Sequence, residues 1–98
     1  MGNFLLTNKA LADLSDTWNY TCETWSEKQA DRYYSMLLDT CKELAKKPDS
    51  GKKYDSVYPD LQGYKVYQHI IFYTAGKGKI EIVRIQHSRM DLKNRLND

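Results

Sequence analysis

The sequence predicts a single α+β domain, residues 1–98, in which an N-terminal strand and a helical hairpin pack on a small antiparallel β-sheet. Two segments with apolar residues at helical spacing occupy the first half of the chain. Two segments rich in β-branched and aromatic residues occupy the second half. Strands that are grouped after helices, and do not alternate with them, favour an antiparallel sheet. A length of 98 residues suits one domain.

The N-terminal residues predict a short strand and a first helix. Residues 3–6 form an apolar run that we interpret as the strand. Thr7 or Asn8 can cap the helix that follows, because either side chain accepts hydrogen bonds from the free N–H groups of the first turn. The helix extends to about residue 22. Its apolar stripe consists of Ala10, Leu11, Leu14, Trp18 and Cys22.

A second helix start follows at once. Ser26 and Gln29 form a capping box, and Trp25 stands where a hydrophobic staple is expected. Pro48 ends the helix. The short link between the two helices predicts an αα-hairpin. The apolar stripe of the second helix consists of Ala30, Tyr34, Leu37, Leu38, Cys41, Leu44 and Ala45.

The C-terminal half predicts a loop and a strand pair. Residues 48–63 read as a long irregular loop, and loops of this length are more often functional than idle. We expect strands at residues 64–74 and 79–86, joined by a turn in which Gly76 and Gly78 can adopt positive φ. Residues after His87 predict a short terminal helix lined by Met90, Leu92 and Leu96.

The stretch at residues 69–73 is apolar at successive positions and does not alternate. Such a strand is covered on both faces. Because a chain of this size has little material for a second cover, we expect a partner chain to supply part of it.

Composition narrows the class of protein. The formal net charge is +2, from 15 basic and 13 acidic side chains, which does not indicate direct nucleic-acid binding through phosphate neutralisation. The chain has no apolar run long enough for a membrane span, and its N-terminal residues are too polar for a signal peptide. We therefore expect a cytoplasmic protein. Cys22 and Cys41 have no metal-ligand spacing, and the sequence predicts neither a metal nor a cofactor.

Three polar residues have two readings each. His69 and His87 could act as acid and base in an RNA-cleaving site, but without a further catalytic group at a defined spacing we favour a structural role for both. Arg84 lies among isoleucines and needs a partner. That partner is either a carboxylate of this chain or an acidic group of another protein, and the sequence does not choose between them.

The string HIIFY at residues 69–73, followed by IEIVRIQHSRMD at residues 80–91, resembles the C-terminal half of ParE toxins. These toxins belong to the RelE/ParE superfamily of bacterial toxin–antitoxin systems. The helical half is also similar, in LADL at residues 11–14, Trp25, Tyr33-Tyr34 and KPD at residues 47–49. Many members carry a second basic residue and a glycine just before the HIIFY-like strand, where this chain has Tyr67-Gln68, and Lys65 stands where arginine is common.

The resemblance implies a toxin that is not an enzyme, that inhibits DNA gyrase, and that is neutralised in a hetero-oligomer by a ParD-type antitoxin. The runner-up is a ribosome-dependent mRNA endonuclease of the RelE type, which uses Lys, Arg and Tyr side chains, and a third reading is a binding module without toxicity. The residues that we expect to contact the antitoxin are Leu11, Leu14, Trp18, Tyr34, Tyr64, Tyr67, Ile71, Tyr73 and Arg84. Those that we expect to contact gyrase are Lys65, His87, Arg89 and Met90.

Overall fold

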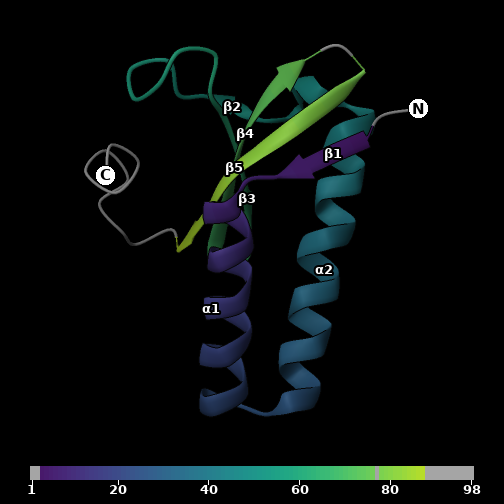
Figure 1. The fold of residues 1–98 in the computed structure, drawn as a ribbon, viewed down its shortest axis with the longest axis vertical. Coiled ribbons are helices and arrows are strands. Elements are labelled where there is room, and N and C mark those ends of the chain that lie inside the picture. The colour runs from purple at the N-terminus through teal and green to yellow at the C-terminus, as the bar shows by residue number, and fades with distance from the viewer. Residues whose placement is uncertain (1–2, 77, 88–98) are drawn as a thin grey trace.

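The computed structural model describes residues 3–76 and 78–87. This part of the chain forms two layers, a helical hairpin and a sheet (Figure 1), which confirms the predicted α+β architecture. The helices are α1 (Asn8–Thr24) and α2 (Glu27–Lys46), and α2 is followed by a 3-10 turn, η1 (Pro48–Ser50). The strands are β1 (Asn3–Leu6), β2 (Lys52–Lys53), β3 (Gln62–Val66), β4 (His69–Gly76) and β5 (Lys79–His87). Among the described residues, no helix is long and apolar enough to cross a membrane.

The described strands form one sheet in the order β1-β5-β4-β3-β2. β2, β3, β4 and β5 pair antiparallel with their neighbours, but β1 runs parallel to β5. The small antiparallel sheet is thus confirmed for β2 to β5, and the N-terminal strand makes the whole sheet mixed by pairing parallel to β5. Parallel neighbours need a long crossover connection, which the helical hairpin and the β2-β3-β4 segment supply here. A four-residue apolar run shows where a strand lies but not its direction.

The predicted strand at residues 64–74 is two strands, β3 and β4, joined by the two-residue turn Tyr67-Gln68. The sequence contains no glycine or proline to mark this turn. Tyr67 itself adopts the left-handed conformation, with φ of 53°. At the next turn Gly78 has φ of 71°, as expected of a glycine there.

Both helix caps are confirmed. The Thr7 hydroxyl accepts a hydrogen bond from the Ala10 N–H (3.1 Å), and the Ser26 hydroxyl accepts one from the Gln29 N–H (3.0 Å). Trp25 does not form a hydrophobic staple, because 74% of its surface is exposed. The ring therefore stands in solvent at the tip of the hairpin.

The main core lies between the helical hairpin and the sheet. Its fully buried members include Leu14 of α1, Leu37 and Cys41 of α2, and Ile71 and Tyr73 of β4. Cys22 and Cys41 are free thiols, and burial raises the pKa of Cys41 to about 12. The Tyr73 hydroxyl donates to the Pro48 carbonyl (2.7 Å) and accepts from the Gly51 N–H (2.9 Å), which fastens η1 to the sheet.

A second apolar cluster covers the opposite face of the sheet. Ile70 and Phe72 of β4 pack there against Leu61, with Tyr54 and Val57 beside them. The rings of Tyr54 and Phe72 meet edge to face, with their centroids 5.2 Å apart. The loop between β2 and β3 thus covers both buried side chains, so this pair does not need the cover that we expected a partner chain to supply in part.

Candidate functional site

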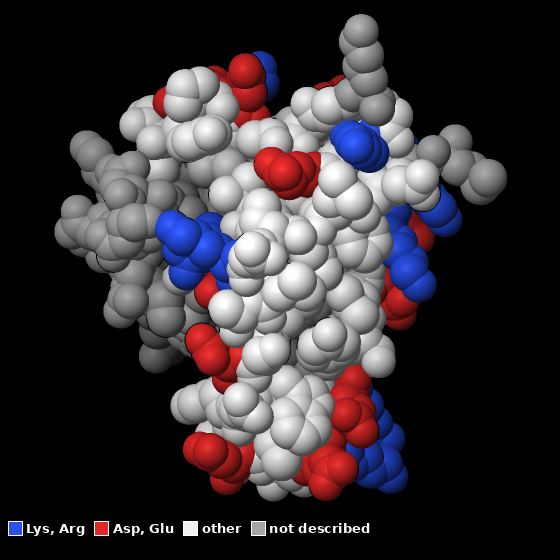
Figure 2. All heavy atoms as spheres, viewed as in Figure 1, with Lys and Arg blue, Asp and Glu red and all other residues white. Residues whose placement is uncertain are grey.

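The outer side of the hairpin carries an uncharged stripe. Leu11 and Trp18 are seven residues apart and so share one face of α1, and Leu11 is 45% exposed. Trp18 donates its indole N–H to Asp31 of α2 (2.9 Å), and Asp31 lies one turn before the half-buried Tyr34. Figure 2 shows an area of uncharged side chains down the middle of this face. Leu11, Trp18 and Tyr34, which we call the hairpin stripe, are therefore placed to meet an apolar partner surface.

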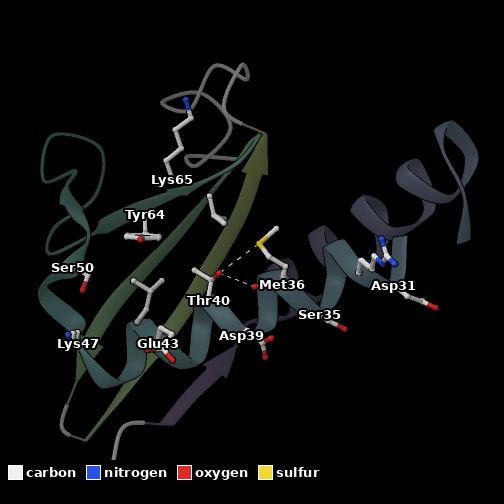
Figure 3. Close-up of a pocket in the computed structure, with 13 residues that line it drawn as sticks. Asp31, Ser35, Met36, Asp39, Thr40, Glu43, Lys47, Ser50, Tyr64 and Lys65 are labelled. Carbon is white, nitrogen blue, oxygen red and sulfur yellow. Dashed lines mark hydrogen bonds between the residues drawn. The ribbon is translucent and has the colours of Figure 1, made fainter. Parts of the chain in front are cut away.

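A groove of about 870 Å³ lies between α2 and β3 (Figure 3). We call it the α2 groove. Met36, Thr40 and Leu44 of α2 line one wall, and residues 64–66 of β3 line the other. Acidic and basic side chains both border it, among them Asp39, Glu43 and Lys47. The groove can therefore take a segment that has apolar side chains and charges of both signs.

The open edge of β3 faces this groove. β2 pairs only with Gln62 and Gly63, so within the described residues no strand pairs with the outer edge of residues 64–66. Tyr64 pairs with Ile71 and therefore points to the helical side, where it is 38% exposed. Lys65 points to the opposite side, as Figure 3 also shows. An unpaired edge beside a groove with apolar walls is a template for strand addition.

A second groove, of about 840 Å³, lies on the other flank of the hairpin, between α1 and the adjoining ends of β4 and β5. We call it the α1 groove. Its lining includes Asp16, Tyr20, Trp25, Tyr33, His69 and His87. Tyr20 and Trp25 are 67% and 74% exposed. This groove therefore exposes two large aromatic side chains at its rim.

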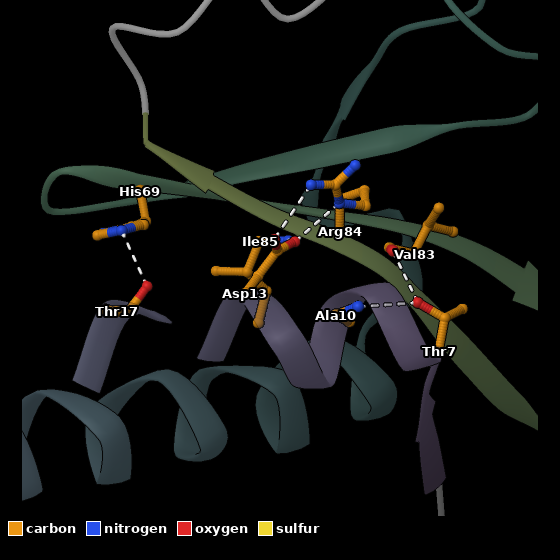
Figure 4. Close-up of polar contacts among 8 residues, drawn as sticks. All are labelled: Thr7, Ala10, Asp13, Thr17, His69, Val83, Arg84 and Ile85. Atoms are coloured by element: carbon orange, nitrogen blue, oxygen red, sulfur yellow. Dashed lines mark hydrogen bonds and ion pairs between the residues drawn. The ribbon is translucent and has the colours of Figure 1, made fainter. Parts of the chain in front are cut away.

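His69 joins both helices to the sheet at the base of the α1 groove. Its Nδ1 atom lies 2.6 Å from the Tyr33 hydroxyl, and its Nε2 atom lies 3.4 Å from the Thr17 hydroxyl (Figure 4). Burial, followed by repulsion from His87, lowers the pKa of His69 to about 4. Burial raises the pKa of Tyr33. At neutral pH His69 is an uncharged, hydrogen-bonded group, which is the structural role that the sequence favoured.

Arg84 is held by a carboxylate of this chain. Its Nε and Nη2 atoms donate to the two oxygens of Asp13, at 2.8 and 3.1 Å (Figure 4). The two side chains are only 18% and 13% exposed. The internal partner is thus the correct alternative for the guanidinium, and contact between Arg84 and the antitoxin stays a prediction.

The remaining predicted contact residues divide by burial. Leu14, Ile71 and Tyr73 are at most 1% exposed and belong to the core, so they are not available to a partner, contrary to expectation. The hairpin stripe, Tyr64 and the 72% exposed Tyr67 remain at the surface.

Lys65 and His87 point to different regions, so the structure does not bring the expected gyrase contacts together. Arg89 and Met90 lie outside the described residues, as does the predicted terminal helix. Tyr33 was not among the predicted site residues. Two adjacent tyrosines on a helix cannot both lie in its buried stripe, and this signal could have indicated that Tyr33 lies outside it. Within residues 3–76 and 78–87, no group of three or more His, Cys, Asp or Glu side chains could hold a metal ion.

Known proteins resemble this chain over almost its whole length. Residues 4–92 match the model of the ParE toxin of the type II toxin–antitoxin system parDE. Toxin ParE1 of Mycobacterium tuberculosis is 32% identical over 94 residues, which cover 95% of this chain and 96% of the relative. Toxin ParE of Escherichia coli is 32% identical over 99 residues, which cover 100% of this chain and 96% of the relative. Toxin ParE1 of Caulobacter vibrioides is 29% identical over 96 residues, covering 98% and 99%.

A solved structure supports the fold. A chain of the chromosomal ParDE system from P. aeruginosa superposes with a TM-score of 0.76 at 19% identity, over 89% of this chain and 96% of that one. The family match extends from β1 beyond β5 and so includes every described helix and strand but the first residue of β1. The chain therefore belongs to the ParE toxin family of type II toxin–antitoxin systems.

Proposed function

We propose that this chain is a toxin that inhibits DNA gyrase by binding it, without catalysing a reaction, and that a ParD-type antitoxin neutralises it. The observation that carries the proposal is the near full-length similarity to several proteins named ParE toxins. Gyrase acts on DNA in the bacterial cytoplasm, so the proposal also places the chain there.

The antitoxin surface that we propose consists of the α2 groove, the open edge of β3 and the hairpin stripe. An extended segment of the antitoxin adds to residues 64–66 by main-chain hydrogen bonds, and its side chains enter the groove beside Met36 and Tyr64. A helical segment then crosses α2 and buries Leu11, Trp18 and Tyr34. This route joins the exposed members of the predicted contact set other than Tyr67 and leaves the core residues untouched.

Arg84 supports a non-catalytic action. Endonuclease chemistry requires a cation that is free to stabilise negative charge developing on phosphorus. Here both oxygens of Asp13 engage the guanidinium, and the buried amide of Gln86 can turn its oxygen to it as well. The guanidinium thus links β5 to α1 through this ion pair.

Induced expression in a bacterial host tests the proposal. Expression without the antitoxin should arrest growth and induce the DNA-damage response, and co-expression of the ParD-type protein from the adjacent reading frame should restore growth. Arrest accompanied by new cuts in translated mRNA, with no DNA-damage response, would instead identify a RelE-type endonuclease. Harmless expression of the folded protein would identify a binding module without toxicity.

A further inference from the structure

The α1 groove takes no part in the proposed antitoxin surface, yet it exposes large aromatic side chains to water. Its rim exposes Trp25 and Tyr20, two large rings that water solvates poorly. Neither ring belongs to the apolar clusters of the fold. Exposed aromatic side chains around a concave surface are typical of binding sites.

A continuous series of rings leads into this groove. The ring centroids of Tyr67 and Tyr33 lie 6.4 Å apart, those of Tyr33 and His69 lie 5.3 Å apart, and those of His69 and His87 lie 5.5 Å apart. The series begins at the turn between β3 and β4 and ends at the last residue of β5. It therefore forms one wall of rings between the turn and the groove.

Tyr67 occupies a conformation that does not suit it. A two-residue hairpin turn with positive φ only at its first position favours glycine there, and Tyr67 has φ of 53°. Its side chain is 72% exposed, so core packing does not compensate for the strain. Residues with strained backbone conformations cluster at functional sites, where the strain is kept because the residue is needed for function.

The charge beside the groove is negative. Residues 10–24 contain Asp13, Asp16 and Glu23 and no Lys or Arg, although the whole chain has a net charge of +2. Arg84 neutralises Asp13, which leaves Asp16 and Glu23. Figure 2 shows acidic side chains without basic neighbours over the lower part of α1, whereas both signs occur over α2. A nucleic acid would be repelled here, and a cationic protein segment would be attracted.

We propose that the α1 groove is a docking site for an extended cationic segment of a partner protein, which places an Arg or Lys side chain beside Asp16 and Tyr33 in the groove and runs on over the neighbouring ring of Tyr67. A guanidinium suits this position because it pairs with a carboxylate and stacks on aromatic faces at once. The amides of Gln29 and Gln68 border the same groove and can bind the main chain of the segment. This site is separate from the antitoxin surface and does not depend on gyrase being the target.

Selection from random dodecapeptides displayed on phage tests the site. Phage that bind the wild-type chain are depleted on the Asp16→Lys variant, and the remaining peptides are synthesised and titrated against the full chain by NMR. We expect peptides with Arg or Lys beside an apolar residue, which shift the resonances of Tyr33 and His69. Their affinity should fall about tenfold in Asp16→Lys and in Tyr67→Gly, and stay unchanged in Asp39→Lys, a carboxylate of the α2 groove.

Tyr67→Gly separates binding from folding, because it removes the ring and relieves the backbone strain together. The proposal requires weaker peptide binding with equal or greater thermal stability. Recovery of no peptide that distinguishes wild type from Asp16→Lys, or recovery of peptides without a cation, would overturn it. So would movement of the Tyr33 and His69 resonances in the free Arg89→Glu/Lys93→Glu/Arg95→Glu variant, since the occupant would then be the chain's own C-terminal residues.

Discussion

Asp13 of α1 binds Arg84 of β5 through both carboxylate oxygens and also accepts the N–H of Ile85 (2.9 Å). β1 covers the edge of β5 only as far as Ile82. Beyond that point the Thr7 hydroxyl donates to the Val83 carbonyl (2.8 Å), and Asp13 accepts the N–H of Ile85. Two side chains at the start of α1 thus continue the pairing that β1 leaves incomplete.

Removing Asp13 should therefore destabilise the fold. Asp13→Ala removes the carboxylate that binds both a mostly buried guanidinium and a strand N–H, so we expect the free energy of unfolding to fall by about 2–3 kcal/mol. Urea unfolding followed by circular dichroism measures it. The control is Asp16→Ala, which removes an exposed carboxylate of the same helix and should change stability by about 0.5 kcal/mol or less. Equal effects of the two substitutions would refute the anchoring role.

His69 should make the protein sensitive to acid. Its pKa is lowered from 6.5 to about 4, so between these values the unfolded chain binds the proton more readily than the folded chain does. His69 therefore opposes folding increasingly as the pH falls from 6.5 to 4. Because its side chain is partly exposed and solvent screens it, we expect an effect of about 1–2 kcal/mol. His69→Gln should lose less stability than wild type over this range, and equal losses would contradict the assignment.

Gly51 should not tolerate a side chain. A Cβ atom at this position would lie 2.6 Å from the Tyr73 hydroxyl oxygen, which is itself fixed by the Pro48 carbonyl. We expect Gly51→Ala to lower the free energy of unfolding by about 1–3 kcal/mol, measured by thermal or urea unfolding. The matched control is Gly76→Ala, where the nearest atom to a new Cβ would be 3.6 Å away and stability should change little.

The α2 groove should control antitoxin binding. Ser35 is exposed and lines the groove, so Ser35→Trp should block it and weaken binding of the purified ParD-type antitoxin at least about tenfold in calorimetry. Ser56→Trp places the same residue on the exposed loop over the other face of the sheet and should leave the affinity unchanged. If Ser35→Trp binds as tightly as Ser56→Trp, the antitoxin does not occupy this groove.

Leu11→Asp tests the hairpin stripe in the same assay. Leu11 is 45% exposed, so the substitution places a charge where we expect apolar burial without disturbing the core, and the affinity should fall by about tenfold or more. Leu5→Asp is the control. Leu5 is 50% exposed and pairs with Glu81, on the sheet face away from the main core. An effect of Leu5→Asp as large as that of Leu11→Asp would argue against the proposed route.

Local signals in the sequence predicted most of the elements. The caps at Thr7 and Ser26 form as their side chains require, and the helical stripes supply the core that Leu14 and Leu37 occupy. Contacts between distant residues were not predictable in this way. Asp13 and Arg84 are 71 positions apart, and nothing near either residue identifies the other. The loop residues that cover Ile70 and Phe72 are too sparse to show a period.

The exposed contact residues were harder to predict than the core, because their exposure also depends on contacts between distant parts of the chain. An apolar stripe on a helix is wider than its buried part, so the pattern could not separate the buried Leu14 from the exposed Leu11. The turn at Tyr67 was hidden because it uses neither glycine nor proline. Only the fold shows that this tyrosine stands beside Tyr33, which lines the α1 groove.

Supercoiling of relaxed plasmid by purified gyrase, measured with increasing amounts of the purified chain, tests the proposed function most directly. We predict loss of supercoiling with accumulation of gyrase–DNA cleavage complexes, and recovery when the ParD-type antitoxin is added in equal amount. Normal supercoiling in the presence of excess folded chain would contradict the account.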